Sequence, residues 1–343
     1  MIKEKSDKKI FGFDKNIFNL GLVSFFNDMS SEMIYPIIPI FLSTVLGVNK
    51  SVIGLIEGVA EGAGSILRVF SFFFSDKMKK RKEIVVIGYA LSAITKPFLA
   101  IANSGLGVLF VRIFDRTGKA LRNPPRDAMI AGMIEKSARG KAFGLQRAMD
   151  DAGAVAGPLL CFGFLYLFNS NYRLIFLLSF IPAIIAVLVI LFFVKEKHSG
   201  KIIAEKIAKE HFSKDFYIFV GITVIFNLGN SSNAFLFLRA QDFGVPVLLI
   251  PLTWVVFNGV SSIFGVPAGI FSDKVGRRNV LIAGFVIYGV TYMGFAFWKS
   301  PAAIWILMAI YGIYFGFTEG VGRAYIADFV EDKSKLGTAS GIY

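Results

Sequence analysis

Residues 106–131, LGVLFVRIFDRTGKALRNPPRDAMIA, place seven charged side chains between segments that are apolar enough to span a bilayer. From residue 112 to 126 the charges are three, one, three, three and four positions apart, so on an α-helix they form one broad stripe. Ionised groups at bilayer depth persist only against a water-filled cavity or against opposite charges inside a helix bundle. The stripe therefore predicts a helix whose charged face looks into a protein interior. A soluble helix or a basic nucleic-acid patch is the alternative, and the long flanking apolar segments argue against both.

The composition extends this interpretation to the whole chain. The 343 residues are 55% hydrophobic and 15% aromatic, with a mean hydropathy of +0.63, which is typical of an all-α polytopic membrane protein. A single cysteine, Cys161, excludes an internal disulfide framework. The sequence contains no nucleophile–base constellation, phosphate loop or metal-ligand spacing, so we expect neither an enzyme nor a cofactor.

About 20 residues of helix cross the hydrocarbon core. On this scale the sequence predicts ten spans, at 17–42, 52–75, 84–102, 105–130, 141–167, 173–194, 216–238, 247–272, 279–298 and 302–328, and the start of an eleventh near Gly337.

Lysine and arginine predict how the spans are threaded. One alternating set of connections, which includes the N-terminus, contains 24 basic residues, and the other set contains four. The positive-inside rule therefore predicts a cytoplasmic N-terminus. The apolar stretch after it is long and lacks a small-residue cleavage site, so we expect a retained first helix, in a cell (inner or plasma) membrane. The net charge of +13 is then a signal of topology and no sign of a nucleic-acid partner.

The charges inside the spans are balanced. Nine basic and nine acidic residues lie there, eight of each before residue 195, so we expect the first half to hold an internally paired charge network.

The two halves of the chain repeat one another. DKMKKRK begins at Asp76 and DKVGRR at Asp273, while GLVSFFN ends at Asn27 and GITVIFN at Asn227, offsets of 197 and 200 residues. A repeat of this length with six spans each is typical of transporters built from paired bundles around a central site. We expect a bundle at 1–194, a cytoplasmic linker at 195–215 and a second bundle at 216–343. Two further helices would complete the second bundle, so we expect a fragment or a truncated reading frame.

These features resemble the major facilitator superfamily of secondary transporters, over essentially the whole chain. The sequence GIFSDKVGRR from Gly269 fits the family's loop motif G-x-x-x-D-[RK]-x-G-[RK]-[RK], and the first-half copy lacks both glycines. The resemblance implies that both loops help to hold the cytoplasmic side shut. The residues concerned are Asp76, Lys77, Arg81, Gly269, Asp273, Lys274, Gly276, Arg277 and Arg278.

Two further motifs resemble the family. Arg112-Ile-Phe-Asp115-Arg116-Thr-Gly118 is similar to a fourth-helix motif whose leading arginine interacts with proton-carrying acids in proton-coupled members. Gly153-Ala-Val-Ala-Gly157-Pro158 is similar to a fifth-helix motif associated with antiporters, although close helix packing alone would also explain its glycines.

Counting residues along the spans gives the depth of each charge. Asp28 and Glu32 lie about 16 Å and about 22 Å from the cytoplasmic face, and Arg112 and Arg116 about 10 Å and about 16 Å from the outer one. In a core of about 30 Å, Arg112 is level with Glu32 and Arg116 with Asp28. We hypothesise that Asp28, Glu32 and Glu61 carry protons and that the two arginines adjust the proton affinity of these carboxylates. The proposed charge network is Asp28, Glu32, Glu61, Arg112, Asp115, Arg116 and Asp150.

Amides beside aromatic side chains suit a ligand with apolar and hydrogen-bonding parts. Asn227, Asn230 and Asn233 are three residues apart, which predicts one helix face. The candidates for a substrate cavity are Asn27, Arg147, Asn227, Asn230, Trp254, Asn258, Glu319 and Arg323.

The sequence favours a secondary transporter that works by alternating access, a monomer that exchanges protons for an exported small molecule. Uptake or exchange of an organic or phosphate-bearing anion is an alternative, since the basic groups of residues 112–122 could receive one. A membrane protein that is truncated and does not transport is the third.

Overall fold

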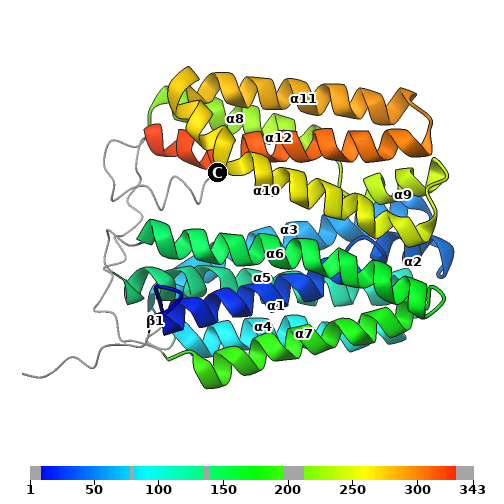
Figure 1. Cartoon of the computed structure of the whole chain (residues 1–343), viewed down its shortest axis with the longest axis horizontal. Helices are drawn as coiled ribbons and strands as arrows, with labels where there is room; N and C mark the ends of the chain where they lie inside the picture. The colour runs from blue at the N-terminus through cyan, green and yellow to red at the C-terminus, as the bar shows by residue number, and fades with distance from the viewer. Residues whose placement is uncertain (1–8, 78–80, 135–138, 196–211, 330–343) are drawn as a thin grey trace, which may run out of the picture. The chain divides into compact units, whose positions relative to one another are not determined.

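The computed structural model describes residues 9–77, 81–134, 139–195 and 212–329, and all its long elements are α-helices (Figure 1). The chain consists of two compact units, Met1–Ile203 and Ala204–Tyr343. The first unit opens with a hairpin, β1 (Lys9–Ile10) and β2 (Phe13–Asp14), that the sequence analysis did not predict. Phe11 and Gly12 between the strands have φ of 49° and 80°, as a two-residue hairpin turn requires.

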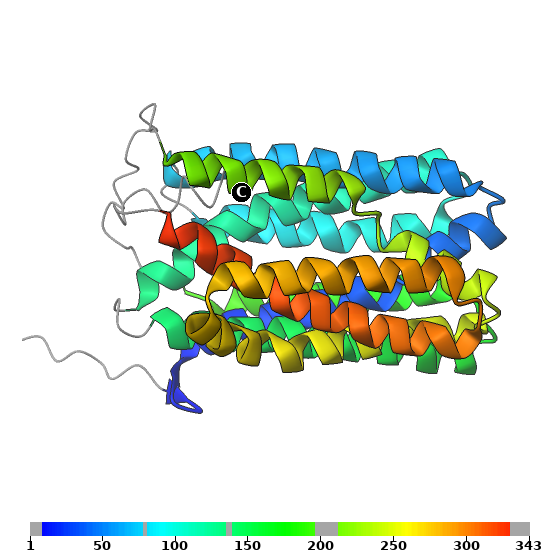
Figure 2. The ribbon, with the colours of Figure 1, turned by 90° about the horizontal axis from the view of Figure 1, so that it is seen from above.

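The helices of each unit run alongside one another in both views (Figures 1 and 2). Each of the ten predicted spans falls on one helix or on two consecutive short ones. The first unit contains α1 (Lys15–Ile34), α2 (Ile38–Thr44), α3 (Lys50–Lys77), α4 (Arg81–Ile101), α5 (Gly105–Met133), α6 (Arg139–Leu167) and α7 (Tyr172–Phe193). The second unit contains α8 (Lys214–Gly229), α9 (Ala234–Asp242), the 3₁₀ turn η2 (Val247–Leu249), α10 (Ile250–Val275), α11 (Arg277–Phe297) and α12 (Pro301–Asp328). The predicted eleventh span lies outside the described residues.

Within the described ranges, seven helical segments are long and apolar enough to cross a membrane. They correspond to α4, most of α6, α7, α8 with α9, η2 with α10, α11 and α12. The remaining helices, α1 with α2, α3 and α5, carry many of the interior charges predicted above. The number of crossings therefore depends on whether these charges are sheltered from lipid.

Two of the predicted spans are broken. The first is interrupted at 35–37, where Pro36 has no N–H to donate and its ring clashes with the carbonyl of the preceding turn. The seventh is interrupted at 230–233, Asn-Ser-Ser-Asn, whose short polar side chains compete with helical hydrogen bonds. The prediction that Asn227, Asn230 and Asn233 share one helix face is therefore wrong: Asn227 is helical, Asn230 follows the end of α8, and Asn233 precedes α9.

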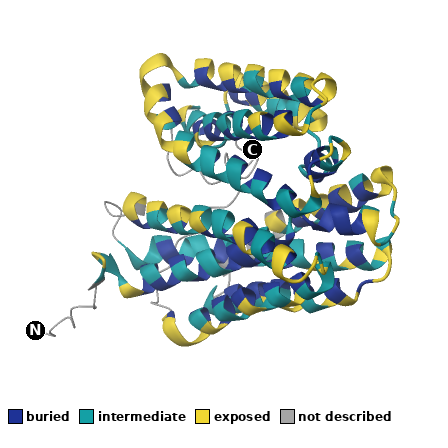
Figure 3. Ribbon diagram, turned by 45° about the vertical axis from the view of Figure 1, so that its right-hand side comes forward, coloured by how far each residue is buried: buried dark blue, intermediate teal, exposed yellow. Residues whose placement is uncertain are grey.

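Each unit has an apolar core of its own. In the first unit, Leu20 of α1, Tyr89 of α4 and Ile190 of α7 belong to one buried cluster. In the second, Phe216, Leu281 and Ile326 belong to another. Exposed positions recur along faces of the helices (Figure 3), and among them the large apolar side chains of Tyr166, Phe192 and Ile225 are at least 70% exposed. Such faces are compatible with lipid and unfavourable in water.

Candidate functional site

The most buried charge pair of the first unit joins α3 to α5. Arg112 donates from Nε and Nη2 to the two carboxylate oxygens of Glu57, at 3.0 and 2.6 Å. Both side chains are buried, with Arg112 5% and Glu57 2% exposed, and the guanidinium carbon lies 5.8 Å from the centre of the Tyr35 ring. A bidentate pair of this kind satisfies both ions within the protein, as burial demands.

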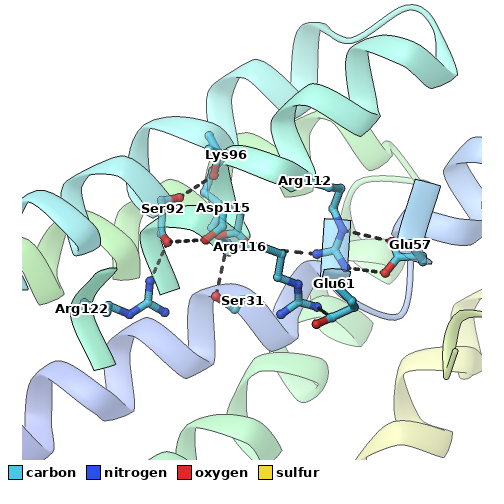
Figure 4. A network of polar contacts seen from close by, with 10 residues as sticks. Ser31, Glu57, Glu61, Ser92, Lys96, Arg112, Asp115, Arg116 and Arg122 are labelled. Carbon is cyan, nitrogen blue, oxygen red and sulfur yellow. Dashed lines mark hydrogen bonds and ion pairs between the residues drawn. The ribbon is translucent and has the colours of Figure 1, made fainter. Parts of the chain in front are cut away.

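A second pair lies one turn further along the same two helices. Arg116 forms an ion pair with Glu61, so both pairs join residues that are 55 positions apart (Figure 4). Glu61 is 51% exposed, whereas Arg116 is 15% exposed. The two pairs form a ladder, with buried Arg112–Glu57 as one rung and accessible Arg116–Glu61 as the other.

Glu57 was not among the predicted network residues, although the sequence contains a signal for it. Counting residues puts Glu32 level with Arg112, whereas the carboxylate that Arg112 binds is Glu57. Under the predicted threading α3 and α5 enter from the same side, and both charged residues lie seven positions after the first residue of their helix, Lys50 or Gly105. Equal counts on parallel helices place two residues at equal depth. By this count Glu57 is as good a candidate partner for Arg112 as Glu32.

Lys96 of α4 extends the network. Its ammonium lies 3.8 Å from the Asp115 carboxylate and donates to the Ser31 hydroxyl at 3.3 Å. Asp115 also lies 3.9 Å from Nη1 of Arg112. Lys96 is 3% exposed. One carboxylate of α5 is thus shared by two cations, and the contacts link α1, α4 and α5 (Figure 4).

Arg122 and Lys119 of α5 differ from the other cations of this helix. Arg122 is 3% exposed, donates from Nη1 to the Ser92 hydroxyl at 2.6 Å, and lies 4.7 Å above the centre of the Tyr89 ring. Lys119 is half-buried and forms no ion pair or hydrogen bond with any described residue. Neither side chain has a carboxylate within ion-pair distance in the described part of the chain. Among the described residues, the expected internal pairing therefore does not extend to these two positions.

The acids of α1 and α6 have mainly local partners. Asp28 accepts a hydrogen bond from the buried Asn27 at 3.0 Å, and Asp150 accepts one from Gln146 at 3.1 Å. The half-exposed Arg147 pairs with Asp151 at 3.0 Å. Of the predicted network, the structure thus brings together Arg112, Asp115, Arg116 and Glu61, and places Asp28, Glu32 and Asp150 on the neighbouring helices α1 and α6.

Helices α1 and α6 approach each other at the two motif glycines. A Cβ atom on Gly153 would lie 2.5 Å from the Phe25 carbonyl oxygen, and one on Gly157 would lie 2.5 Å from that of Met29. Pro158 follows inside α6. Both glycines therefore permit backbone contact with α1, the helix that carries Asp28 and Glu32.

In the second unit, tyrosine hydroxyls donate hydrogen bonds to residues at both ends of the break between α8 and α9. Tyr288 donates to the side-chain oxygen of Asn230 at 3.2 Å, and Tyr311 to that of Asn233 at 3.0 Å. The buried Trp254 stacks on Phe257, with ring centres 4.2 Å apart.

The other cavity candidates of the second unit lie on α8, α10 and α12. Asn227 is exposed on α8 and Asn258 lies on α10. Glu319 and Arg323 pair along α12 at 2.8 Å.

The loop with the complete motif forms a tight junction between α10 and α11. Gly276 has a φ of +90°, which favours glycine. Arg277 donates to the Ala324 carbonyl and the Asp328 carboxylate of α12, and its Nη2 lies 3.4 Å from Asp273. Gly269 and Lys274 lie on α10, and Arg278 is exposed at the start of α11.

In the first-half copy of the loop, Arg81 begins α4. The side chains of Asp76 and Lys77 lie outside the described part of the structure.

Comparisons with known proteins agree with the helical architecture. The profile of the Major Facilitator Superfamily matches residues 20–343. An uncharacterized MFS-type transporter of Methanocaldococcus jannaschii is 37% identical over 348 residues, covering 99% of this chain and 86% of that protein. The multidrug resistance protein MdtH of Photorhabdus laumondii is 29% identical over 128 residues, which is 37% of this chain and 32% of that protein. The crystal structure of the nucleoside transporter NupG superposes with a TM-score of 0.75 at 16% identity, over 95% of this chain and 86% of that one.

Proposed function

Because this chain belongs to the Major Facilitator Superfamily of membrane transporters, we propose that it exports a small molecule in exchange for protons. The family assignment makes it a multi-pass secondary transporter rather than an enzyme. Proton coupling, export and the residues responsible are the proposal. In it, the first bundle lies at 1–194, the linker at 195–215 and the second bundle at 216–343, and transport proceeds by alternating access.

The accessible Arg116–Glu61 pair carries the proposal. A proton carrier must reach water in at least one state and must stabilise different contacts in its charged and neutral forms. Glu61 is 51% exposed and is bound to the largely buried Arg116. Protonation of Glu61 would remove the counter-charge of Arg116, which would then need another carboxylate.

We propose that Asp28 and Glu32 supply the replacement carboxylate when Glu61 is protonated. They lie one turn apart on α1, and their ionised forms attract the α5 residue Lys119 without forming an ion pair with it. A helix that moves with the loss of one ion pair and the gain of another links protonation to conformation. The direct contact of α1 with α6 at Gly153 and Gly157 would carry that movement to a second helix.

Export of a drug-like molecule is supported by two observations. The Gly153–Gly157–Pro158 sequence resembles the motif associated with antiporters, and a third of the chain is similar to a protein named for multidrug resistance. Stacked Trp254, Phe257 and Tyr311 in the second unit could present apolar surface to such a substrate if the packing opened during transport.

Proteoliposomes with an imposed pH gradient test the proposal. We expect the full chain to accumulate at least one of two probes, ethidium or benzoate, in vesicles with an acidic interior, and to lose accumulation when an ionophore collapses the gradient. Asp28→Asn or Glu32→Gln should abolish gradient-driven accumulation without loss of expression. Asp242→Asn, at an exposed acid of α9, serves as the matched control and should transport normally.

Other outcomes identify a different function. Undiminished accumulation in both α1 variants would remove these acids from the mechanism. Exchange of benzoate or phosphate that is independent of the pH gradient would instead favour the anion exchanger. The two cations of α5 that have no carboxylate partner among the described residues support this alternative.

A further inference from the structure

Two cations of α5 have no carboxylate partner among the described residues, although the cations around them do. Arg112 binds Glu57, Arg116 binds Glu61, and Arg126 binds Asp127. Lys119 and Arg122 lie between these paired arginines, and no carboxylate of a described residue comes within ion-pair distance of either. An uncompensated charge inside a protein is strongly unfavourable, so the site is poised to receive a negative group.

Arg122 is held in place with donors to spare. Ser92 accepts one hydrogen bond from Nη1, and the Tyr89 ring supports the guanidinium face. Its Nε is buried and has no hydrogen-bond partner. A guanidinium that is oriented by neutral groups and retains a free donor is arranged to bind a carboxylate or phosphate oxygen.

The nearby acids are already engaged or do not reach the two cations. Asp115 is shared by Lys96 and Arg112. Asp28 and Glu32 on α1 attract Lys119 electrostatically but form no ion pair with it. The negative group for Lys119 and Arg122 must therefore come from a rearrangement of these acids or from a ligand.

Position favours a ligand that arrives from the cytoplasm. Lys119 and Arg122 are three residues apart, hence on one face of α5, and lie 14 and 17 positions after Gly105. These positions correspond to about 21 and about 25 Å from the outer end of the helix, in the inner half of the bilayer under the predicted threading. An exporter captures its substrate on that side.

We propose that Lys119 and Arg122 bind the anionic group, a carboxylate or a phosphate, of the exported molecule. This inference rests on the proposed transport function and adds the class of substrate to it.

Direct binding to the purified full chain tests the inference without any proton gradient, so a failure of proton coupling would leave the result unaffected. The probes are benzoate, its neutral isostere benzamide and inorganic phosphate, titrated at constant ionic strength with thermal stabilisation as the readout. We expect benzoate or phosphate to bind at least about tenfold more tightly than benzamide, because ammonium and guanidinium groups form stronger hydrogen bonds with an anion than with a neutral amide.

Variants of the two cations locate the site. Lys119→Gln and Arg122→Gln should each weaken anion binding about tenfold or more, while Lys299→Gln, which removes an exposed charge from another part of the chain, should bind as the unmodified protein does. If Arg122→Gln does not fold, Arg122→Lys keeps the charge, loses the planar fork and should still bind more weakly.

Three results would overturn the inference. They are unchanged anion affinity in Lys119→Gln together with either Arg122 variant, equal binding of benzoate and benzamide, and no binding of benzoate or phosphate. Binding of phosphate alone or of benzoate alone would support it and would identify the anion.

Discussion

At the scale of residues, opposite charges in this chain are matched by position along two parallel helices. Glu57 and Glu61 are four residues apart on α3, as Arg112 and Arg116 are on α5, so one alignment of the helices forms both pairs. Burial distinguishes the two rungs. The Arg112–Glu57 pair is buried and suits a structural role, while Glu61 of the second pair is 51% exposed.

This difference predicts unequal effects of removing each acid. Glu57→Gln should lower the free energy of unfolding by about 3–5 kcal/mol, since it leaves Arg112 buried without a counter-charge. Glu61→Gln, at a half-exposed partner, should lower it by about 0–1 kcal/mol. Thermal unfolding in detergent, followed by circular dichroism of the helices, measures both. Equal losses in the two variants would show that burial does not distinguish the rungs.

At the scale of elements, close contact between helices depends on the positions of glycines, which have no side chain. Gly153 and Gly157 bring α6 against the backbone of α1, whereas Gly163 of the same helix has no atom within 4 Å of the place a Cβ would occupy. The same residue type therefore has different roles along one helix.

Alanine substitutions should separate these roles. Gly157→Ala should destabilise the protein by about 1–3 kcal/mol through overpacking and should slow transport, because the added methyl meets backbone atoms of α1 that cannot rotate away. Gly163→Ala is the matched control and should be neutral or stabilising by up to about 1 kcal/mol, since alanine is the better helix former. A Gly157→Ala protein as stable as the control would contradict the close approach.

At the scale of the whole molecule, the distribution of basic residues predicts the orientation in the membrane. The 24 lysines and arginines of one set of connections, against four in the other, predict that the N-terminus and the junction between α10 and α11 face the cytoplasm. The loop between α11 and α12 is then predicted to lie outside. Helix α11, 21 residues long, separates the two loops by about 30 Å, enough to cross the hydrocarbon core.

Labelling of single cysteines in intact cells tests this orientation. An impermeant maleimide should react with Lys299→Cys directly and with Arg278→Cys only after the membrane is permeabilised. The unmodified chain is its own control, because its only cysteine, Cys161, is fully buried and should not react. Labelling of Arg278→Cys from outside would reverse the topology.

The sequence by itself determined the spans, their predicted threading and the presence of charges inside the first half. Hydropathy and charge are properties of a segment, and the bilayer imposes the same length on every helix that crosses it. Depth along the membrane normal could also be counted, which is why Arg116 and Glu61 were both among the predicted residues.

Only the tertiary structure decided which charges meet. Equal depth allows several partners for each arginine, and the choice of Glu57 for Arg112 depends on which helix faces α5 and by how much each is rotated. The breaks at 35–37 and 230–233 likewise reflect competition between local hydrogen bonds and a continuous helix. In the described part of the chain, Lys119 and Arg122 remain without carboxylates for the same reason: overall charge balance is a sum over the sequence, whereas an ion pair requires two groups within a few ångströms.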